Sequence, residues 1–230
     1  MQILNELLFI SSAVIIVIFD YIALYLGKDF LVASIVTQGL LANIFIIKQV
    51  SLFGLSVTCT DVFIIGIVLA INLLEEVYGK DASNKAVMSY LFSLLLVFSF
   101  KYLHLWYLPS ANDFSQIHYQ ALFETSTRII LATFAVSFFS LQLDRFLYRL
   151  LSRYLGVSYL PFKNFFTTAV SQLLDTILFS WLALRGIVAN MSHLIIFSYL
   201  VKILSLLVVT IMLSLTKSFI KQQKNWNKDN

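Results

Sequence analysis

Seven stretches of about 20 mostly apolar residues follow one another along this 230-residue chain, and no other feature restricts its fold as strongly. An α-helix needs about 20 apolar residues to cross the roughly 30 Å hydrocarbon core of a bilayer. Hydrophobic residues make up 60% of the chain and charged residues only 12%. A soluble domain carries about 25% charged residues, which keep its surface in water. The sequence therefore predicts an all-α, polytopic transmembrane helix bundle.

Helix-breaking residues separate the expected segments. A Gly or Pro lies in each of the six connections, and neither residue suits the interior of a helix. Gly39 and Gly66 lie inside segments, where we expect two helices to pack closely. The expected segments are Leu7–Leu26, Phe30–Gln49, Val57–Tyr78, Ala86–Leu108, Ala121–Leu143, Asn164–Arg185 and Ser192–Thr216. Residues 1–220 form one transmembrane domain in this prediction, and residues 221–230 form a polar, frayed cytoplasmic tail.

The positions of Lys and Arg predict an orientation, because cytoplasmic connections carry an excess of these residues. Eleven of the 16 lie in the first, third and fifth connections or at the C-terminus, against three at or near the other connections. This pattern places the N-terminus outside and the C-terminus in the cytoplasm, in a bacterial inner membrane. The basic residues are scattered singly, so the pI of about 9.1 reflects membrane topology, and we expect no nucleic-acid partner.

A polar stripe in the sixth segment is the first candidate site. An ionisable group at membrane depth costs roughly 2.5–3.5 kcal/mol, so it usually faces a partner or a water-filled cavity. Asp175 lies near the middle of its segment and fits either an ion pair with Arg128 or Lys202, or a carboxylate that faces a ligand. We favour the second interpretation, in which the Asp175 carboxylate faces a ligand. The stripe, whose members recur at helical spacing, consists of Asn164, Thr168, Ser171 or Gln172, and Asp175.

The third segment supplies further candidates. Glu75 and Glu76 lie at its cytoplasmic end, one helical turn after Asn72. The simplest interpretation is that both acids are solvated at the headgroups beside Lys80 and Lys85. However, the C-terminus of a helix disfavours acidic residues, so two together indicate a local purpose.

The sequence carries none of the common signatures of catalysis. The three histidines lack the spacing of metal ligands, and the sequence contains neither a Walker-type loop nor a Gly-x-Ser-x-Gly motif. We therefore expect no enzyme activity, no bound metal and no cofactor.

An ordered set of polar residues runs through the chain: Asn43, the run Ile71–Lys80, Arg128, the run Ser171–Thr176, and Lys202. This set resembles the queuosine precursor transporter family, whose members are also described as vitamin-uptake-like membrane proteins. The resemblance covers roughly residues 30–216 and makes the first segment, residues 7–26, an addition before a shared six-helix part. One departure is Asn72, where the family usually has Asp, so a negative charge there would have to come from Glu75.

The resemblance implies import of 7-deazaguanine bases, such as 7-cyano- or 7-aminomethyl-7-deazaguanine or queuine, for tRNA modification. A guanine-like edge presents an N–H and an exocyclic amine side by side, and a carboxylate can accept both. We therefore expect Asp175 to be this acceptor. The expected binding residues are Asp175, Gln172, Ser171, Arg128, Lys202, Asn43, Glu75, Glu76 and Asn72.

Several alternatives stay open at this point. The chain could instead be a membrane scaffold whose buried charges only hold helices together, an intramembrane enzyme acting on lipids, or a transporter of another small vitamin-like solute. Facilitated diffusion, proton coupling and energisation by a separate module all fit the sequence, as does a homo-oligomer in the bilayer.

Overall fold

Seven long helices form the structure, a computed structural model that describes residues 2–45, 48, 50–52, 55–57, 60–123, 127–185 and 191–229. They correspond to the seven apolar segments, so the prediction of an all-α membrane helix bundle is confirmed. The long helices are α1 (Gln2–Leu26), α2 (Lys28–Phe45), α3 (Asp61–Tyr78), α4 (Lys80–Leu105), α6 (Thr127–Ser152), α7 (Leu160–Phe179) and α8 (Met191–Asp229).

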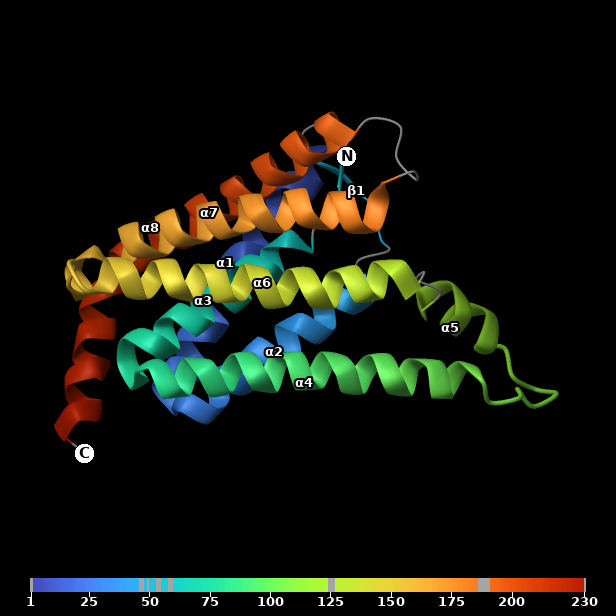
Figure 1. Cartoon of the computed structure of the whole chain (residues 1–230), viewed down its shortest axis with the longest axis horizontal. Coiled ribbons are helices and arrows are strands. Elements are labelled where there is room, and N and C mark those ends of the chain that lie inside the picture. Colours follow the sequence, from blue (N-terminus) through green and yellow to red (C-terminus); the bar gives the residue numbers. More distant parts are fainter. Residues whose placement is uncertain are drawn as a thin grey trace.

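The long helices run side by side and give the bundle two ends (Figure 1). One end carries the α1–α2, α3–α4 and α6–α7 connections and the last turns of α8, and is called the basic end below. The other, the hairpin end, carries the beginning of α1 and the strands β1 (Val50–Leu52) and β2 (Leu55–Val57). Because α1 begins and α8 ends at opposite ends of the bundle, the chain traverses it an odd number of times.

α3 is the central helix. It contacts α1, α2, α4, α6, α7 and α8, and every residue from Ile65 to Leu74 is buried. Close packing requires small residues here: a Cβ on Gly66 would collide with Gln38 and Ile16, and one on Gly39 of α2 would collide with Tyr90 of α4. The prediction that these two glycines mark close helix packing is confirmed.

Several segment boundaries differ from the prediction. α2 ends at Phe45 instead of Gln49, and the chain then forms an antiparallel hairpin in which Ser51 lies opposite Ser56. A short helix, α5 (Gln116–Phe123), precedes α6 as a separate element. α6 continues to Ser152, beyond the predicted end at Leu143. The predicted fifth segment ends at Leu143, where several charged residues follow. The helix α6 continues because these charged residues have partners inside the bundle.

The connection before α5 is fixed by Asp113. Its carboxylate accepts hydrogen bonds from the backbone N–H of Ser115 at 2.9 Å and of Gln116 at 3.1 Å, which orders the turn that leads into the helix. The Ser115 hydroxyl also donates to this carboxylate, and these bonds hold the pKa of Asp113 below its ordinary value.

The C-terminal residues also differ from the prediction. Instead of fraying from Lys221, α8 continues as a helix to Asp229, and its last turns, red in Figure 1, point away from the bundle axis. Lys224 in these turns binds a buried carboxylate of α3, described below.

α1 is an integral part of the bundle. Asp20 of α1 is fully buried, and its Oδ1 accepts hydrogen bonds from Ser34 at 2.6 Å and Gln38 at 2.8 Å, both on α2. Val17 and Leu24 belong to the main hydrophobic core. The first helix is therefore packed against the other helices rather than attached at their edge.

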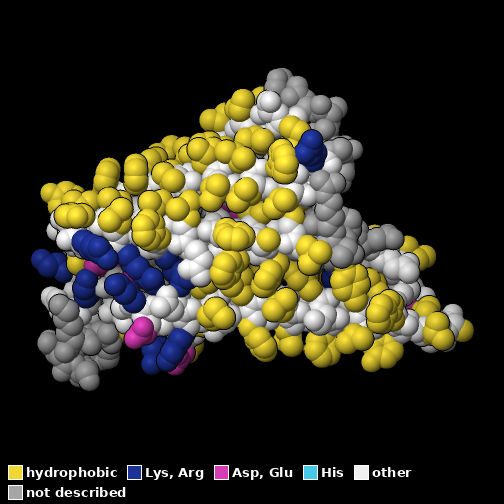
Figure 2. Space-filling model, viewed as in Figure 1, with side chains coloured by type: hydrophobic (Ala, Val, Ile, Leu, Met, Phe, Trp, Pro, Cys, Tyr) yellow, Lys and Arg dark blue, Asp and Glu magenta, His cyan; other side chains and the backbone are white. Residues whose placement is uncertain are grey.

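The exterior of the bundle is apolar. Five helices, α1, α2, α4, α7 and α8, contain stretches long and apolar enough to cross a membrane. Figure 2 shows hydrophobic side chains over most of one face, with Lys and Arg gathered at the basic end. Large side chains such as Phe92, Leu131 and Ile211 are more than half exposed. α3 and α6, which lie among these helices, carry many of the charged residues of the interior.

Candidate functional site

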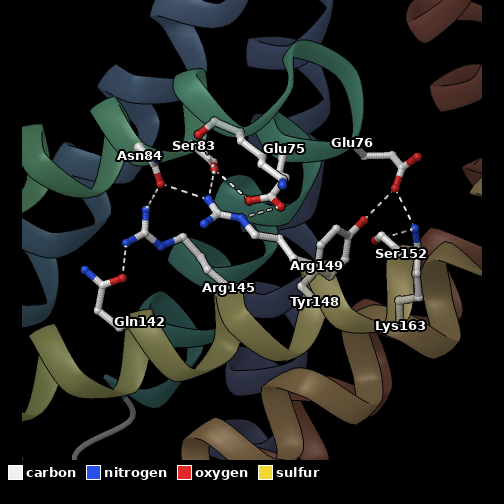
Figure 3. A network of polar contacts seen from close by, with 11 residues as sticks. Glu75, Glu76, Ser83, Asn84, Gln142, Arg145, Tyr148, Arg149, Ser152 and Lys163 are labelled. Carbon is white, nitrogen blue, oxygen red and sulfur yellow. Dashed lines mark hydrogen bonds and ion pairs between the residues drawn. The ribbon is translucent and has the colours of Figure 1, made fainter. Parts of the chain in front are cut away.

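At the basic end, Glu75 of α3 joins α4 and α6 (Figure 3). Its carboxylate accepts hydrogen bonds from Arg149 Nε at 2.9 Å and from the Ser83 hydroxyl at 2.7 Å. Arg149 also donates to Asn84 Oδ1 at 2.8 Å. The side chain of Glu75 is only 8% exposed, so this ion pair is largely shielded from solvent.

The neighbouring Glu76 is the centre of a larger network. Its carboxylate accepts hydrogen bonds from Lys163 Nζ of α7 at 2.6 Å, Lys224 Nζ of α8 at 2.5 Å and the Tyr148 hydroxyl of α6 at 2.8 Å. Lys163 also donates to the Ser152 hydroxyl at 3.1 Å. Four helices thus meet at one buried carboxylate, which is satisfied by two ammonium groups and one phenol.

The simplest sequence interpretation of these acids is therefore wrong. Glu75 and Glu76 are not solvated beside Lys80 and Lys85, because their partners are basic residues of α6, α7 and α8. Residues 145, 149 and 163, which the sequence assigned to a connection, belong to α6 and α7. A helix can hold buried acids near its C-terminus when cations from other helices neutralise them.

A pocket of about 330 Å³ opens at this end of the bundle. Glu76, Tyr148 and Lys163 contribute to its wall, together with Arg149, Arg153 and Lys224. Basic side chains outnumber acidic ones around it.

A second polar group lies one helical turn deeper, between α3, α6 and α7. Asp144 of α6 is 1% exposed, and its Oδ1 accepts a hydrogen bond from the Ser171 hydroxyl at 3.1 Å. Asn72 of α3 donates to Asn164 of α7 at 2.9 Å. Thr167, Thr168 and Asn72 approach the same Asp144 carboxyl group. We call these side chains, together with the buried Gln172 that follows Ser171 on α7, the Asp144 group; its members are Asn72, Asp144, Asn164, Thr167, Thr168, Ser171 and Gln172.

Most members of the Asp144 group retain unused hydrogen-bonding capacity. Within the described residues, ten buried side-chain N or O atoms have no hydrogen-bond partner, and six of them belong to this group. A buried polar atom without a partner costs about 1–3 kcal/mol, so such atoms are normally rare and scattered. The six atoms are Asn72 Oδ1, Asp144 Oδ2, Asn164 Nδ2, Thr167 Oγ1, Thr168 Oγ1 and Gln172 Oε1.

A third group lies towards the hairpin end. Lys202 of α8 binds Asp175 of α7 at 2.5 Å and approaches Asp61, at the start of α3, to 3.8 Å. Lys202 is 5% exposed. The ion pair between Asp175 and Lys202 that the sequence offered as one of two interpretations is thus present, and it occupies the carboxylate expected to bind substrate.

The polar stripe of the sixth segment faces inward as predicted, because Asn164, Thr168, Ser171 and Gln172 are all buried. The structure distributes the nine expected binding residues over several places. Asn72, Ser171 and Gln172 join the Asp144 group, Glu75 and Glu76 lie at the basic end, and Asp175 and Lys202 form the third group.

Two expected residues are not placed in these groups. The Asn43 amide donates to the Gly39 carbonyl of its own helix at 2.9 Å. Arg128 lies in the first turn of α6, but its side chain is outside the described part of the structure, as is the whole of Glu124, with which it could pair at helical spacing.

The sequence interpretation missed Asp144 as well as Tyr148 and Lys163. A signal was present: Ser140, Asp144 and Tyr148 recur every four residues, which places them on one helix face. The expected segment ends at Leu143, so Asp144 and Tyr148 fall outside it in the prediction.

An apolar exterior around buried polar groups is typical of an integral membrane protein. Residues 58–216 match the family described as putative vitamin uptake transporters. The chain is also 34% identical over 165 residues to the probable queuosine precursor transporter of Bacillus subtilis (strain 168), an alignment that covers 70% of this chain and 72% of the relative. The chain belongs to the family of putative vitamin uptake transporters. No solved structure matches it.

The family match begins at residue 58, so it includes α3 and the apolar part of α8 but neither α1 nor α2. It contains all three polar groups apart from Lys224 of the C-terminal turns.

Proposed function

We propose that the protein imports queuosine precursors: 7-deazaguanine bases such as 7-cyano- or 7-aminomethyl-7-deazaguanine, or queuine, for use in tRNA modification. The name of the B. subtilis relative supports this class of substrate. These solutes are planar and polar, so they need hydrogen-bond partners to replace water while they cross the membrane.

The observation that carries this proposal is a continuous line of polar side chains along the inner face of α7. It begins at Lys163 in the basic end, passes Asn164, Thr168 and Ser171, and reaches Asp175. At 1.5 Å per residue, this line follows about 18 Å of helix, which is more than half the hydrocarbon thickness. A planar solute could exchange hydrogen bonds from one member of the line to the next.

A scaffold fits these observations less well. The pairs Lys202–Asp175 and Lys163–Glu76 alone would suit a protein whose buried charges only hold helices together. A scaffold gains nothing from six buried atoms that lack partners within the described residues, whereas a transporter must leave such atoms free for its solute.

We also propose that the basic end faces the cytoplasm of a bacterial inner membrane, because it holds most of the Lys and Arg residues. A cytoplasmic-type reporter fused to the C-terminus should then be active. Activity of a periplasmic-type reporter at the same position would reverse the orientation.

The function can be tested in cells that can neither make nor import queuosine precursors. Expression of this chain, with 7-cyano-7-deazaguanine in the medium, should restore queuosine in tRNA, as measured by nucleoside mass spectrometry. If queuosine stays absent although the protein is present in the membrane and queuine and 7-aminomethyl-7-deazaguanine are also supplied, the proposal is wrong.

A further inference from the structure

We infer that the Asp144 group is the site that binds the polar edge of the deazaguanine base, with Asp144 as the acceptor for its N–H and exocyclic amine. This inference rests on the proposed function and moves the binding carboxylate from Asp175, expected from the sequence, to Asp144.

The partners of the two carboxylates favour Asp144 as the binding residue. Asp175 already holds the ammonium group of Lys202 at 2.5 Å, so binding a base there would first require breaking an ion pair. Asp144 has only neutral neighbours in its group: its Oδ1 accepts the Ser171 hydroxyl, Thr167, Thr168 and Asn72 approach the carboxyl group, and its Oδ2 makes no hydrogen bond within the described residues. Asp144 can therefore accept from a ligand without breaking an ion pair.

The kinds of atom around Asp144 match a neutral heterocycle that both donates and accepts. Asp144 Oδ2 and Asn72 Oδ1 can accept hydrogen bonds, Asn164 Nδ2 can donate one, and the hydroxyls of Thr167 and Thr168 can do either. If the two amides turn over together, they exchange these roles and still present one donor and one acceptor. The edge of a 7-deazaguanine has two adjacent donors beside a carbonyl, so it requires both kinds of partner.

Charged ligands fit this group poorly. A calcium ion prefers six to eight oxygen ligands, with several carboxylates among them, whereas Asp144 is the only carboxylate of the group. An anion would meet the Asp144 carboxylate without a basic residue of the group to offset it. Arg145, the next residue in the chain, points to Asn84 and Gln142 instead (Figure 3).

The position of the Asp144 group also connects it with the pocket at the basic end. Three residues of the pocket wall each have a neighbour in the Asp144 group on the same helix. Glu76 lies four residues from Asn72, Tyr148 lies four residues from Asp144, and Lys163 lies next to Asn164. The Glu76 network therefore stands between the pocket and the Asp144 group. A base released from Asp144 towards the basic end would pass this network.

The test is equilibrium binding to the purified full chain in lipid nanodiscs, with labelled 7-cyano-7-deazaguanine as the probe. The matched competitor is 7-cyano-7-deazahypoxanthine, which lacks only the exocyclic amine. Wild-type protein should prefer the amine-bearing base by about 10- to 100-fold, the range for a hydrogen bond to a charged group. Asp144→Asn should weaken binding of the probe by a similar factor and abolish the preference for the amine.

Asp20→Asn is the control, because it removes the charge of another fully buried carboxyl that lies on α1 and is bound by Ser34 and Gln38. It should leave both affinity and preference unchanged. If Asp144→Asn fails to fold, Thr168→Val and Gln172→Met keep the size of the side chain and should each weaken probe binding about tenfold.

The outcomes separate the site from the function. Wild-type binding that persists in folded Asp144→Asn, with the amine preference intact, would overturn the inference and leave the proposed function standing. The same holds if Asp144→Asn does not fold and both Thr168→Val and Gln172→Met bind like wild type. A wild-type protein that binds none of the three 7-deazaguanine bases would contradict the proposed function itself, and the inference with it.

Discussion

Individual buried charges in this protein differ in how completely they are compensated. Glu76 has two ammonium partners, of which Lys163 is 1% exposed and Lys224 is 27% exposed. Removing one partner of a buried pair leaves an uncompensated charge in a medium of low dielectric constant, whereas an exposed partner is replaced by water. The two lysines should therefore contribute very unequally to stability.

We expect Lys163→Met to lower the free energy of unfolding by about 3 kcal/mol, and Lys224→Met by about 1 kcal/mol or less. Both substitutions keep a long aliphatic side chain, so the comparison isolates the charge. Thermal or denaturant unfolding in detergent measures the difference. Equal losses for the two variants would show that the burial of Lys163 does not determine its contribution.

The ion pair between Asp175 and Lys202 calls for a double-mutant cycle. Asp175→Asn and Lys202→Met should each destabilise the protein, because each leaves the other charge buried. The double variant should lose less than the sum of the two, with a coupling free energy of about 2 kcal/mol. If the losses simply add, the two side chains do not interact as the 2.5 Å contact indicates.

At the scale of the helix, close approach of backbones positions the polar residues. α3 is packed on all sides, and Gly66 lets it approach Gln38 of α2 and Ile16 of α1. Gly156, in contrast, lies in the α6–α7 connection with a φ of −75° and open space where a Cβ would stand. Only the first glycine is required by packing.

Gly66→Val should therefore destabilise the bundle by about 3 kcal/mol or more, because it overpacks the central helix, and should reduce the amount of folded protein in the membrane. Gly156→Ala should be tolerated. Size-exclusion profiles of fluorescent fusions report both outcomes. Normal levels of monodisperse Gly66→Val would mean that α2 and α3 can separate at no cost.

The limits of sequence reasoning are also clearest at the helix scale. The length of the apolar stretches predicted all seven long helices, and helical spacing predicted the polar stripe of α7, because both are local patterns. The apolar stretch ends at Leu143, so the prediction does not show that Asp144 and Tyr148 continue the inner face of α6. The pairing of Glu76 with Lys163 and Lys224 spans 87 and 148 residues, and no local spacing predicts contacts over such separations.

For the whole molecule, the three polar groups lie one after another through a bundle whose outside is apolar. The group around Lys202 and the group around Glu76 are held by ion pairs, and the Asp144 group between them keeps unpaired atoms. This order suits a transporter that binds its solute in the middle and is closed by polar contacts on both sides.

Transport by the purified protein tests the central claim most directly. The chain is reconstituted into liposomes, and entry of labelled 7-cyano-7-deazaguanine is followed over time, with protein-free and Asp144→Asn liposomes as references. We expect wild-type protein to carry the base into the lumen well above the protein-free rate, and Asp144→Asn to carry it at or near that background. Wild-type liposomes that take up none of the three 7-deazaguanine bases faster than protein-free liposomes would contradict the proposal that this bundle is their carrier.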